Sequence, residues 1–160
     1  MIQEHAIALK LWRFFSIKIN MENLIVVKID KDEDLQKALA IRRTVFVDEQ
    51  NCPPELEYEN EDVSTHFLAL YDGEPAGACR WRKTDLGYKL ERFAVLKEYR
   101  GKKVGSALVN AALLDLPADA SYIYLNAQLD AMKLYAKFGF QPVGDQFEEA
   151  GIQHFKMVRK

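Results

Sequence analysis

The alternation of apolar and polar residues predicts a strand, a helix and a loop in the first part of the chain. A β-branched run at 24–29 (LIVVKI) is typical of a strand. Apolar residues then recur at roughly helical spacing through 32–46, which predicts a helix. The segment 51–62 carries two prolines and several acidic residues, so we expect a connecting loop with at most one short turn.

The middle of the chain has the pattern of an antiparallel hairpin and a third strand. Strands are predicted at 66–71 and 75–81, joined by a tight turn at 72–73. A further strand is predicted at 88–95 (YKLERFAV). Strict alternation divides its side chains between two faces, with Leu90, Arg92 and Ala94 on one and Glu91, Phe93 and Val95 on the other.

The last third of the chain predicts two helices and three strands. The helices are expected at 103–116, before Pro117, and at 128–138, before Gly139. The strands are expected at 121–125, 140–143 and 152–158, with an acidic loop at 144–151. This order predicts a mixed α/β (α+β) domain whose sheet is largely antiparallel and becomes parallel at the crossover between 88–95 and 121–125.

Length and charge limit the kinds of protein that fit. A chain of 160 residues with 49% apolar residues is long enough for one domain with a substantial core. A net charge of -2 argues against a nucleic-acid binder, which would carry a basic surplus. We therefore expect a small-molecule or protein partner.

The first 20 residues are expected to be an N-terminal extension ahead of a single domain at 21–160, with Met21 a candidate start. The segment 6–19 mixes apolar and basic residues like a targeting peptide, but it is too short and too interrupted for a membrane span. Its apolar side chains would need a surface to cover them, and a second subunit in a homodimer is one candidate.

The cysteines and histidines predict neither a disulfide framework nor a metal site. Cys52 and Cys79 are far apart in the sequence, and the three histidines are isolated from one another. We expect two reduced thiols in a cytoplasmic protein, with Cys79 packed in the sheet and Cys52 in a loop. Neither belongs to a recognisable Cys-His pair for covalent catalysis.

The segment after the strand at 88–95 predicts an anion site. A glycine-bearing turn that opens a helix presents free backbone N–H groups and the positive end of the helix dipole. Arg100, Lys102 and Lys103 add positive charge suited to a phosphate. Taken alone, the pattern also fits an ordinary connection in which Gly101 and Gly105 only allow close packing.

These residues resemble a known family motif. Residues 100–107 (RGKKVGSA) resemble the acyl-CoA pyrophosphate motif of the GNAT superfamily, Gln/Arg-x-x-Gly-x-Gly/Ala, with Lys103 at the position of its first glycine. From 24 to 160, the chain is similar to the small bacterial branch of N-acetyltransferases related to ElaA and YjcF. The similar segments are IRRTVFVDEQNCPPELE, THFLALYDGEPAGACRWR, KLERFAVLKEYRGKKVGSALV, LNAQLDAMKLYAKFGF and GIQHFKM.

The resemblance implies a sheet of about seven strands in which 88–95 and 121–125 splay apart and receive the pantetheine arm of acetyl-CoA. The residues expected to bind this co-substrate are Phe93, Ala94, Val95, Arg100, Gly101, Lys102, Lys103, Val104, Gly105, Ser106, Asn126 and Tyr135. A backbone N–H of 88–95 would stabilise the oxyanion. By periodicity alone Tyr135 reads as a packing residue and Asn126 as a helix cap.

Three residues are candidates for proton transfer. The resemblance places Tyr135 near the CoA sulfur, where a phenol can protonate the leaving thiolate. Glu91 is the leading base for the amine, although it also fits a strand glutamate paired with nearby cations. His154 is the competing base, because imidazole changes charge near neutral pH; a lone strand histidine is more often structural.

Glu49, Gln50 and the loop after them resemble the acceptor side of the cleft, where acidic side chains would favour a cationic amine. A solvated acidic loop is the equal alternative. The expected function is transfer of acetyl from acetyl-CoA to an amine by direct attack in a ternary complex. The alternatives are a non-catalytic acyl-CoA binding or sensing module, which Lys103 makes plausible, and a structural domain without CoA affinity. The sequence leaves the amine unidentified.

Overall fold

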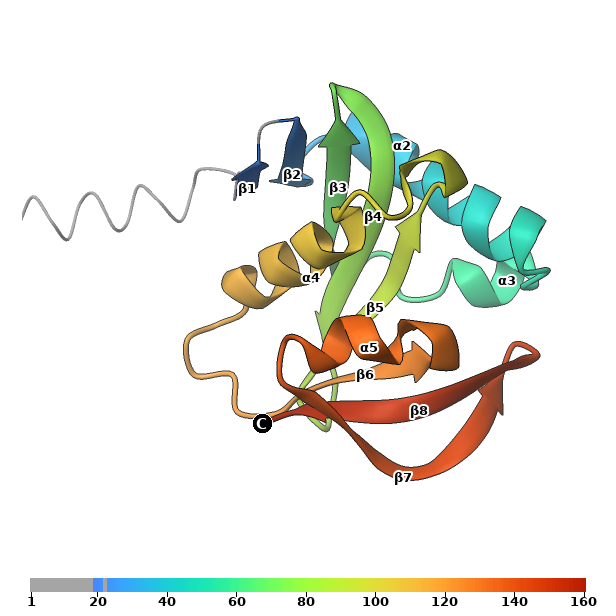
Figure 1. Ribbon diagram of the computed structural model, residues 1–160, viewed down its shortest axis with the longest axis vertical. Helices are drawn as coiled ribbons and strands as arrows, with labels where there is room; N and C mark the ends of the chain where they lie inside the picture. Colours follow the sequence, from blue (N-terminus) through green and yellow to red (C-terminus); the bar gives the residue numbers. More distant parts are fainter. Residues whose placement is uncertain (1–18, 22) are drawn as a thin grey trace, which may run out of the picture.

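The computed structural model describes residues 19–21 and 23–160, which form one eight-stranded sheet with helices on both faces (Figure 1). The strand order is β1-β2-β3-β4-β5-β6-β8-β7. Expectations for residues 1–18, including the homodimer surface, lie outside the described residues. The boundary expected at 20/21 falls within the short strand β1 (Ile19–Met21), which pairs antiparallel with β2.

The remaining elements follow the predicted order. The strands are β2 (Leu24–Lys28), β3 (Ser64–Tyr71), β4 (Glu74–Lys83), β5 (Tyr88–Val95), β6 (Ile123–Gln128), β7 (Phe140–Glu149) and β8 (Ile152–Arg159). The α-helices are α2 (Asp32–Arg42), α3 (Pro54–Glu57), α4 (Val104–Asp115) and α5 (Met132–Ala136). A π-helix η1 (Arg43–Glu49) and two 3₁₀ turns, η2 (Lys97–Tyr99) and η3 (Leu129–Ala131), complete the described chain. No helix in this part of the chain is long and apolar enough to cross a membrane.

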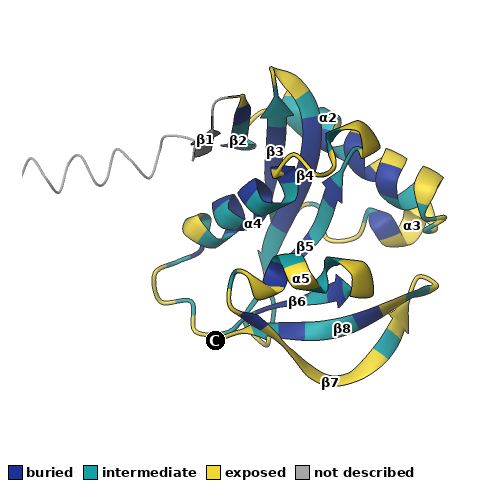
Figure 2. Ribbon diagram, viewed as in Figure 1, coloured by how far each residue is buried: buried dark blue, intermediate teal, exposed yellow. Residues whose placement is uncertain are grey.

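Each face of the sheet buries one apolar cluster under one long helix (Figure 2). Helix α4 packs on β3 and β4 through Val104 and Leu108. A side chain at Gly77 would come within 2.9 Å of Val104, so this glycine permits the close helix approach. Ile41 of α2 packs against Leu68 on the opposite face. The two helices therefore fix the sheet that carries the site.

Strands β5 and β6 are paired only at their beginnings. The parallel register joins Tyr88 to Ile123 and Lys89 to Tyr124. Beyond this point β5 continues along β4, and β6 pairs with β8 through Gln128, opposite His154. The expected fold class and the splayed strands are confirmed, and seven of the eight strands, β2 to β8, match the predicted ones.

A bulge in β5 overturns the predicted division of its side chains. Arg92 has a φ of 59° and the register with β4 shifts nearby, so the alternation slips by one residue. Leu90 packs in the α4 cluster and Ala94 in the α2 cluster, although strict alternation puts both on one face. Glu91 pairs with Arg80 of β4 on the α2 side, opposite Phe93.

Other boundaries also differ from the sequence prediction. The acidic loop expected at 144–151 is mostly strand, because β7 extends to Glu149 and only a tight turn at Ala150 and Gly151 separates it from β8. Both turn residues have positive φ, 50° and 78°, as a two-residue hairpin requires. The helix expected at 128–138 shrinks to η3 and α5, because Gln128 still pairs in β6. The loop at 51–62 does contain one short helix, α3.

Candidate active site

The N-terminus of α4 leaves several backbone donors free. Lys103 caps the helix in the left-handed conformation, with φ 65° and no side-chain capping bond. The first helical hydrogen bond runs from Ala107 N–H to Lys103 O at 3.1 Å. The N–H groups of Val104, Gly105 and Ser106 therefore have no helical acceptor and lie at the positive end of the helix dipole. This geometry suits an anion.

A groove of about 630 Å³ begins at this helix terminus. It is lined by most of the residues expected to bind the co-substrate, namely Phe93, Val95, Arg100, Gly101, Lys103, Val104, Gly105 and Ser106. Lys102 does not line it, because its Nζ lies over the ring of Tyr71 at 5.1 Å. Lys137, just after α5, adds a cation that the sequence analysis missed. Only the fold brings Lys137 into the same groove as Arg100.

The edge of β5 that faces the gap between β5 and β6 offers backbone groups to the groove. Leu96 N–H bonds to Ala76 O of β4 at 2.9 Å, so the alternate residues Phe93 and Val95 direct their backbone groups away from β4, toward the gap. Consistently, Val95 O accepts a bond from Arg100 Nε at 3.0 Å. Ala94 instead buries its side chain in the α2 cluster. The edge of β5 therefore carries unpaired N–H groups beside the groove.

Glu49 lies on the groove side of the gap. Its Oε2 accepts a bond from Arg100 Nη2 at 2.7 Å, and the residue lines the groove but not the smaller cavity described below. The sequence prediction had put Glu49 on the acceptor side. A π-helical end to α2, which no sequence pattern indicated, turns Glu49 toward Arg100.

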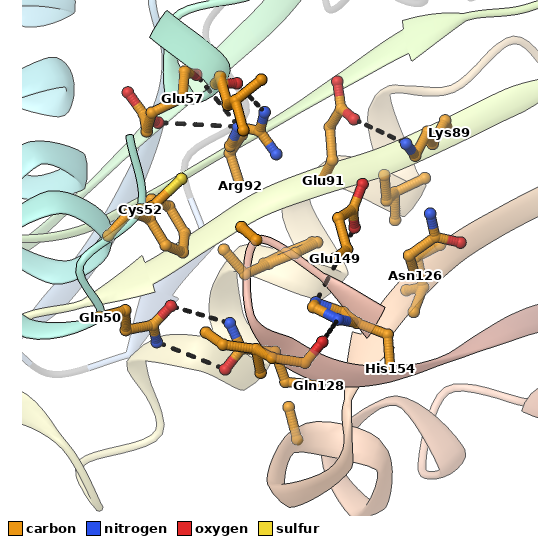
Figure 3. A pocket seen from close by; sticks show the side chains of 18 of the residues that line it. Gln50, Cys52, Glu57, Lys89, Glu91, Arg92, Asn126, Gln128, Glu149 and His154 are labelled. Carbon is orange, nitrogen blue, oxygen red and sulfur yellow. Dashed lines mark hydrogen bonds and ion pairs between the residues drawn. The ribbon is translucent and has the colours of Figure 1, made fainter. Parts of the chain in front are cut away.

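A second cavity, of about 260 Å³, lies where α3, β5, β6 and the β7–β8 hairpin meet (Figure 3). Its lining residues include the three candidates for proton transfer, Glu91, Tyr135 and His154. Asn126 also lines this cavity and not the groove, although it was expected to contact CoA. Gln50 lines both volumes. The structure thus brings together residues from distant parts of the sequence.

His154 is buried and has one ring nitrogen free to accept a proton. Its Nδ1 lies 2.7 Å from Ile152 O. A carbonyl only accepts hydrogen bonds, so Nδ1 carries the proton and Nε2 of the neutral ring keeps its lone pair. Nε2 lies 3.9 Å from Oε2 of Glu149, and the ring stacks on Phe147. Glu149, placed here by the unpredicted length of β7, was missed by the sequence analysis.

Tyr135 is buried at 6% exposure and packs its ring edge-on against Phe93, at 5.5 Å between ring centroids. Burial raises the pKa of its phenol well above the ordinary value, because the charged form loses solvation. The phenol therefore stays protonated at neutral pH. Tyr135 thus combines packing, as its periodicity predicted, with a position in the wall of the cavity.

Glu91 is held by several cations. Its Oε1 accepts bonds from Arg80 at 2.8 Å and from Arg82 at 2.7 Å, and its Oε2 lies 3.2 Å from Lys89 Nζ. Burial opposes its ionisation, but the charges of Arg80, Lys89 and Arg82 outweigh burial and lower the pKa of Glu91 to about 2. A carboxylate so strongly stabilised is a weak proton acceptor. This arrangement matches the ion-paired glutamate that the sequence analysis kept as an alternative.

Two glutamates of the acidic loop pair with buried arginines. Arg42, 1% exposed, donates to Glu57 Oε1 at 2.7 Å and to Glu61 Oε1 at 2.6 Å. Glu61 also accepts a bond from Arg80 at 2.9 Å, which links the loop to β4. These two glutamates therefore hold the loop against the sheet, a role that neither sequence interpretation of the loop anticipated. Glu59 remains exposed in the cavity lining.

The described cysteines are free thiols. Cys79 is buried in the α4 cluster, and burial raises the pKa of its thiol well above the ordinary value. Cys52 lines the cavity, and burial likewise raises its pKa. Both thiols are therefore poor nucleophiles near neutral pH. Among the described residues, no group of His, Cys, Asp and Glu side chains forms a metal site.

The geometry agrees with comparisons to known proteins. The acetyltransferase (GNAT) domain model matches residues 29–160. The N-acetyltransferase YjcF of Bacillus subtilis, described as uncharacterized, is 41% identical over 80% of this chain and 94% of its own length. The crystal structure of Escherichia coli ElaA superposes with a TM-score of 0.74 at 30% identity, covering 88% of this chain and all of ElaA. An acyl-CoA N-acyltransferase from Pseudomonas aeruginosa gives a TM-score of 0.75 at 27% identity, over 86% of this chain and 99% of its own. The chain belongs to the GNAT acetyltransferase family.

Proposed function

We propose that this protein transfers an acetyl group from acetyl-CoA to an amine by direct attack within a ternary complex. The observation that carries the proposal is the separation of β5 and β6 after two residue pairs. The edge of β5 exposed in this way lies between the N-terminus of α4, with its free backbone N–H groups, and the cavity lined by Tyr135 and His154.

The groove supplies what the nucleotide end of CoA requires. Free N–H groups at Val104, Gly105 and Ser106 would bind the diphosphate. Arg100, Lys103 and Lys137 would add positive charge around it. The pantetheine amides would then pair with Phe93 and Val95 in the manner of an added strand. This arrangement would place the thioester beside the cavity.

Starting from the ammonium form, transfer requires the nitrogen to lose two protons and the CoA sulfur to gain one. An alkyl ammonium, with a reference pKa of ~10.4, cannot attack until it is deprotonated. His154 Nε2 would accept this proton. The neutral amine nitrogen then bonds to the thioester carbon while a β5 N–H stabilises the oxyanion, and the nitrogen releases its second proton as the C–S bond breaks, which leaves a neutral amide. Tyr135 would donate its proton to the departing thiolate, and the second proton released by the nitrogen would restore the phenol.

Lys103 no longer favours a non-catalytic binding module over an enzyme. Lys103 replaces the first glycine of the family motif, but it adopts the left-handed conformation that glycine would supply there. The backbone donors of α4 therefore keep their arrangement despite the side chain. No other described feature favours a binding module over an enzyme.

The test is acceptor-dependent release of CoA thiol in a screen of primary amines with acetyl-CoA. Gly105→Glu should abolish acetyl-CoA binding in calorimetry, because a carboxylate would enter the anion site and the new Cβ would crowd Leu134, 3.2 Å away. Gln146→Glu, which adds a carboxylate at an exposed position that lines neither volume, is the control. Wild-type affinity in Gly105→Glu would refute the phosphate assignment, and binding without thiol release from any amine would favour the sensing module.

A further inference from the structure

The groove and the cavity meet at a small set of side chains. Four residues line both volumes, namely Gln50, Phe93, Gln128 and Ala131. Gln50 follows η1 on one wall, and Gln128 ends β6 on the other. Phe93 lies on the β5 edge between them. These residues therefore border the passage between the groove and the cavity.

Gln50 and Gln128 narrow this passage with a reciprocal pair of hydrogen bonds (Figure 3). Gln128 Nε2 donates to Gln50 Oε1 at 2.9 Å, and Gln50 Nε2 donates to Gln128 Oε1 at 3.4 Å. Both residues are half-buried. The two residues are 78 positions apart in the chain, so the pair exists only because the fold opposes the walls of the gap.

We propose that the Gln50–Gln128 pair determines which acyl groups the protein accepts, selecting acetyl over longer aliphatic chains. The inference rests on the proposed function, since it assumes that the thioester lies against the β5 edge at Phe93. The acyl chain beyond the carbonyl then faces the passage. An acetyl group ends one carbon beyond the carbonyl and leaves the Gln50–Gln128 hydrogen bonds intact.

A longer chain meets two obstacles at this place. Its methylene groups must either contact the polar amides or push them apart. If the amides separate, a half-buried donor and acceptor on each side lose their partners, and an aliphatic chain cannot replace those hydrogen bonds. Both the polarity and the small size of the passage therefore disfavour acyl chains longer than acetyl.

The test compares the binding of acetyl-CoA and butyryl-CoA by calorimetry in the wild type, Gln50→Ala, Gln128→Ala and Gln128→Leu. The wild type should bind acetyl-CoA more tightly, by on the order of tenfold. The alanine variants should lose this preference. Gln128→Leu keeps most of the volume without the amide, so a lost preference there assigns the effect to polarity and a retained one assigns it to size.

Gln146→Ala is the matched control. Gln146 donates to Gln153 at 3.0 Å in an exposed amide pair that lines neither volume, so its removal should leave the acetyl preference unchanged. A wild-type preference in both alanine variants would overturn the inference. Because binding needs no acceptor, failure of every form to bind CoA would instead refute the proposed function.

Discussion

Arg100 Nη2 lies 2.7 Å from Glu49 Oε2, so an ion pair joins the loop before α4 to the end of the π-helix. The same guanidinium donates through Nε to Val95 O. Both side chains are substantially exposed, at 45% and 33%, so the pair contributes at most ~1 kcal/mol to folding stability. The pair also bears on binding, because Glu49 puts a negative charge into a groove proposed to hold phosphates.

Glu49→Gln should therefore tighten acetyl-CoA binding. Removal of one nearby negative charge is worth roughly 1 kcal/mol in a solvated groove, or about a fivefold lower Kd. Arg100 stays in place through its bond to Val95 O. Asp48→Asn, at an exposed neighbour that lines neither volume, should change the Kd little. Equal or weaker binding by Glu49→Gln in calorimetry would contradict this expectation.

Tyr135→Phe should reduce kcat on the order of 10²-fold, because it removes the proposed acid while it keeps the ring. The aromatic contacts with Phe93 and Phe140 should survive. The Kd for acetyl-CoA and the melting temperature should therefore stay near those of the wild type. An unchanged rate with a good acceptor would remove Tyr135 from the mechanism and leave it as a packing residue.

His154→Gln should also reduce turnover on the order of 10²-fold without loss of acetyl-CoA affinity, because Nε2 is the proposed proton acceptor. Gln153→Ala, at the exposed position next to it, is the control and should retain its rate. Steady-state assays of thiol release separate the two variants. Wild-type turnover in His154→Gln would exclude His154 as the base.

The sequence predicted the elements better than their details. The seven strands β2 to β8 carry strong β-branched or alternating patterns, and all were found in order. The bulge at Arg92 was missed, because a positive φ at a non-glycine residue has no marker in the sequence. That one residue moves Glu91 to the face opposite Phe93, which is why Glu91 pairs with Arg80.

The candidate site was predictable where backbone geometry defines it and unpredictable where distant side chains meet. The glycine turn and helix start predicted at residues 100–106 lie at the groove, beside the free N–H groups that begin α4. The bond between Gln50 and Gln128 spans 78 positions, and no local period reports such a contact. Likewise, the sequence indicates only a solvated or substrate-facing loop at Glu57 and Glu61. Nothing in the sequence shows that Arg42, in α2, pairs with both carboxylates.

Glu91→Gln should destabilise the fold rather than abolish the chemistry. The pKa of Glu91 falls from 4.5 to about 2 on folding, which corresponds to about 3 kcal/mol of stability. A depressed carboxyl pKa stabilises the native state above about pH 4.5, and this contribution disappears as the pH falls toward 2. Denaturant unfolding should show a constant gap between wild type and variant above pH 5 that closes in acid.

Two outcomes would contradict this assignment of Glu91. A pH-independent gap would mean that the carboxylate charge is not the source of the stabilisation. A folded Glu91→Gln protein with turnover reduced as far as in His154→Gln would return Glu91 to the list of candidate bases. Glu98→Gln, at an exposed carboxylate outside both volumes, is the control.

Substitutions of Lys103 test whether the motif's glycine is needed for its left-handed conformation or for the absence of a side chain. Its left-handed backbone strains any residue with a Cβ by ~1 kcal/mol, so Lys103→Gly should be at least as stable as Lys103→Ala in denaturant unfolding. Both variants lose the same positive charge, so their acetyl-CoA affinities should fall equally. Much tighter binding by the glycine variant would show that the side chain obstructs the anion site, and Lys103 would then limit CoA affinity by its bulk.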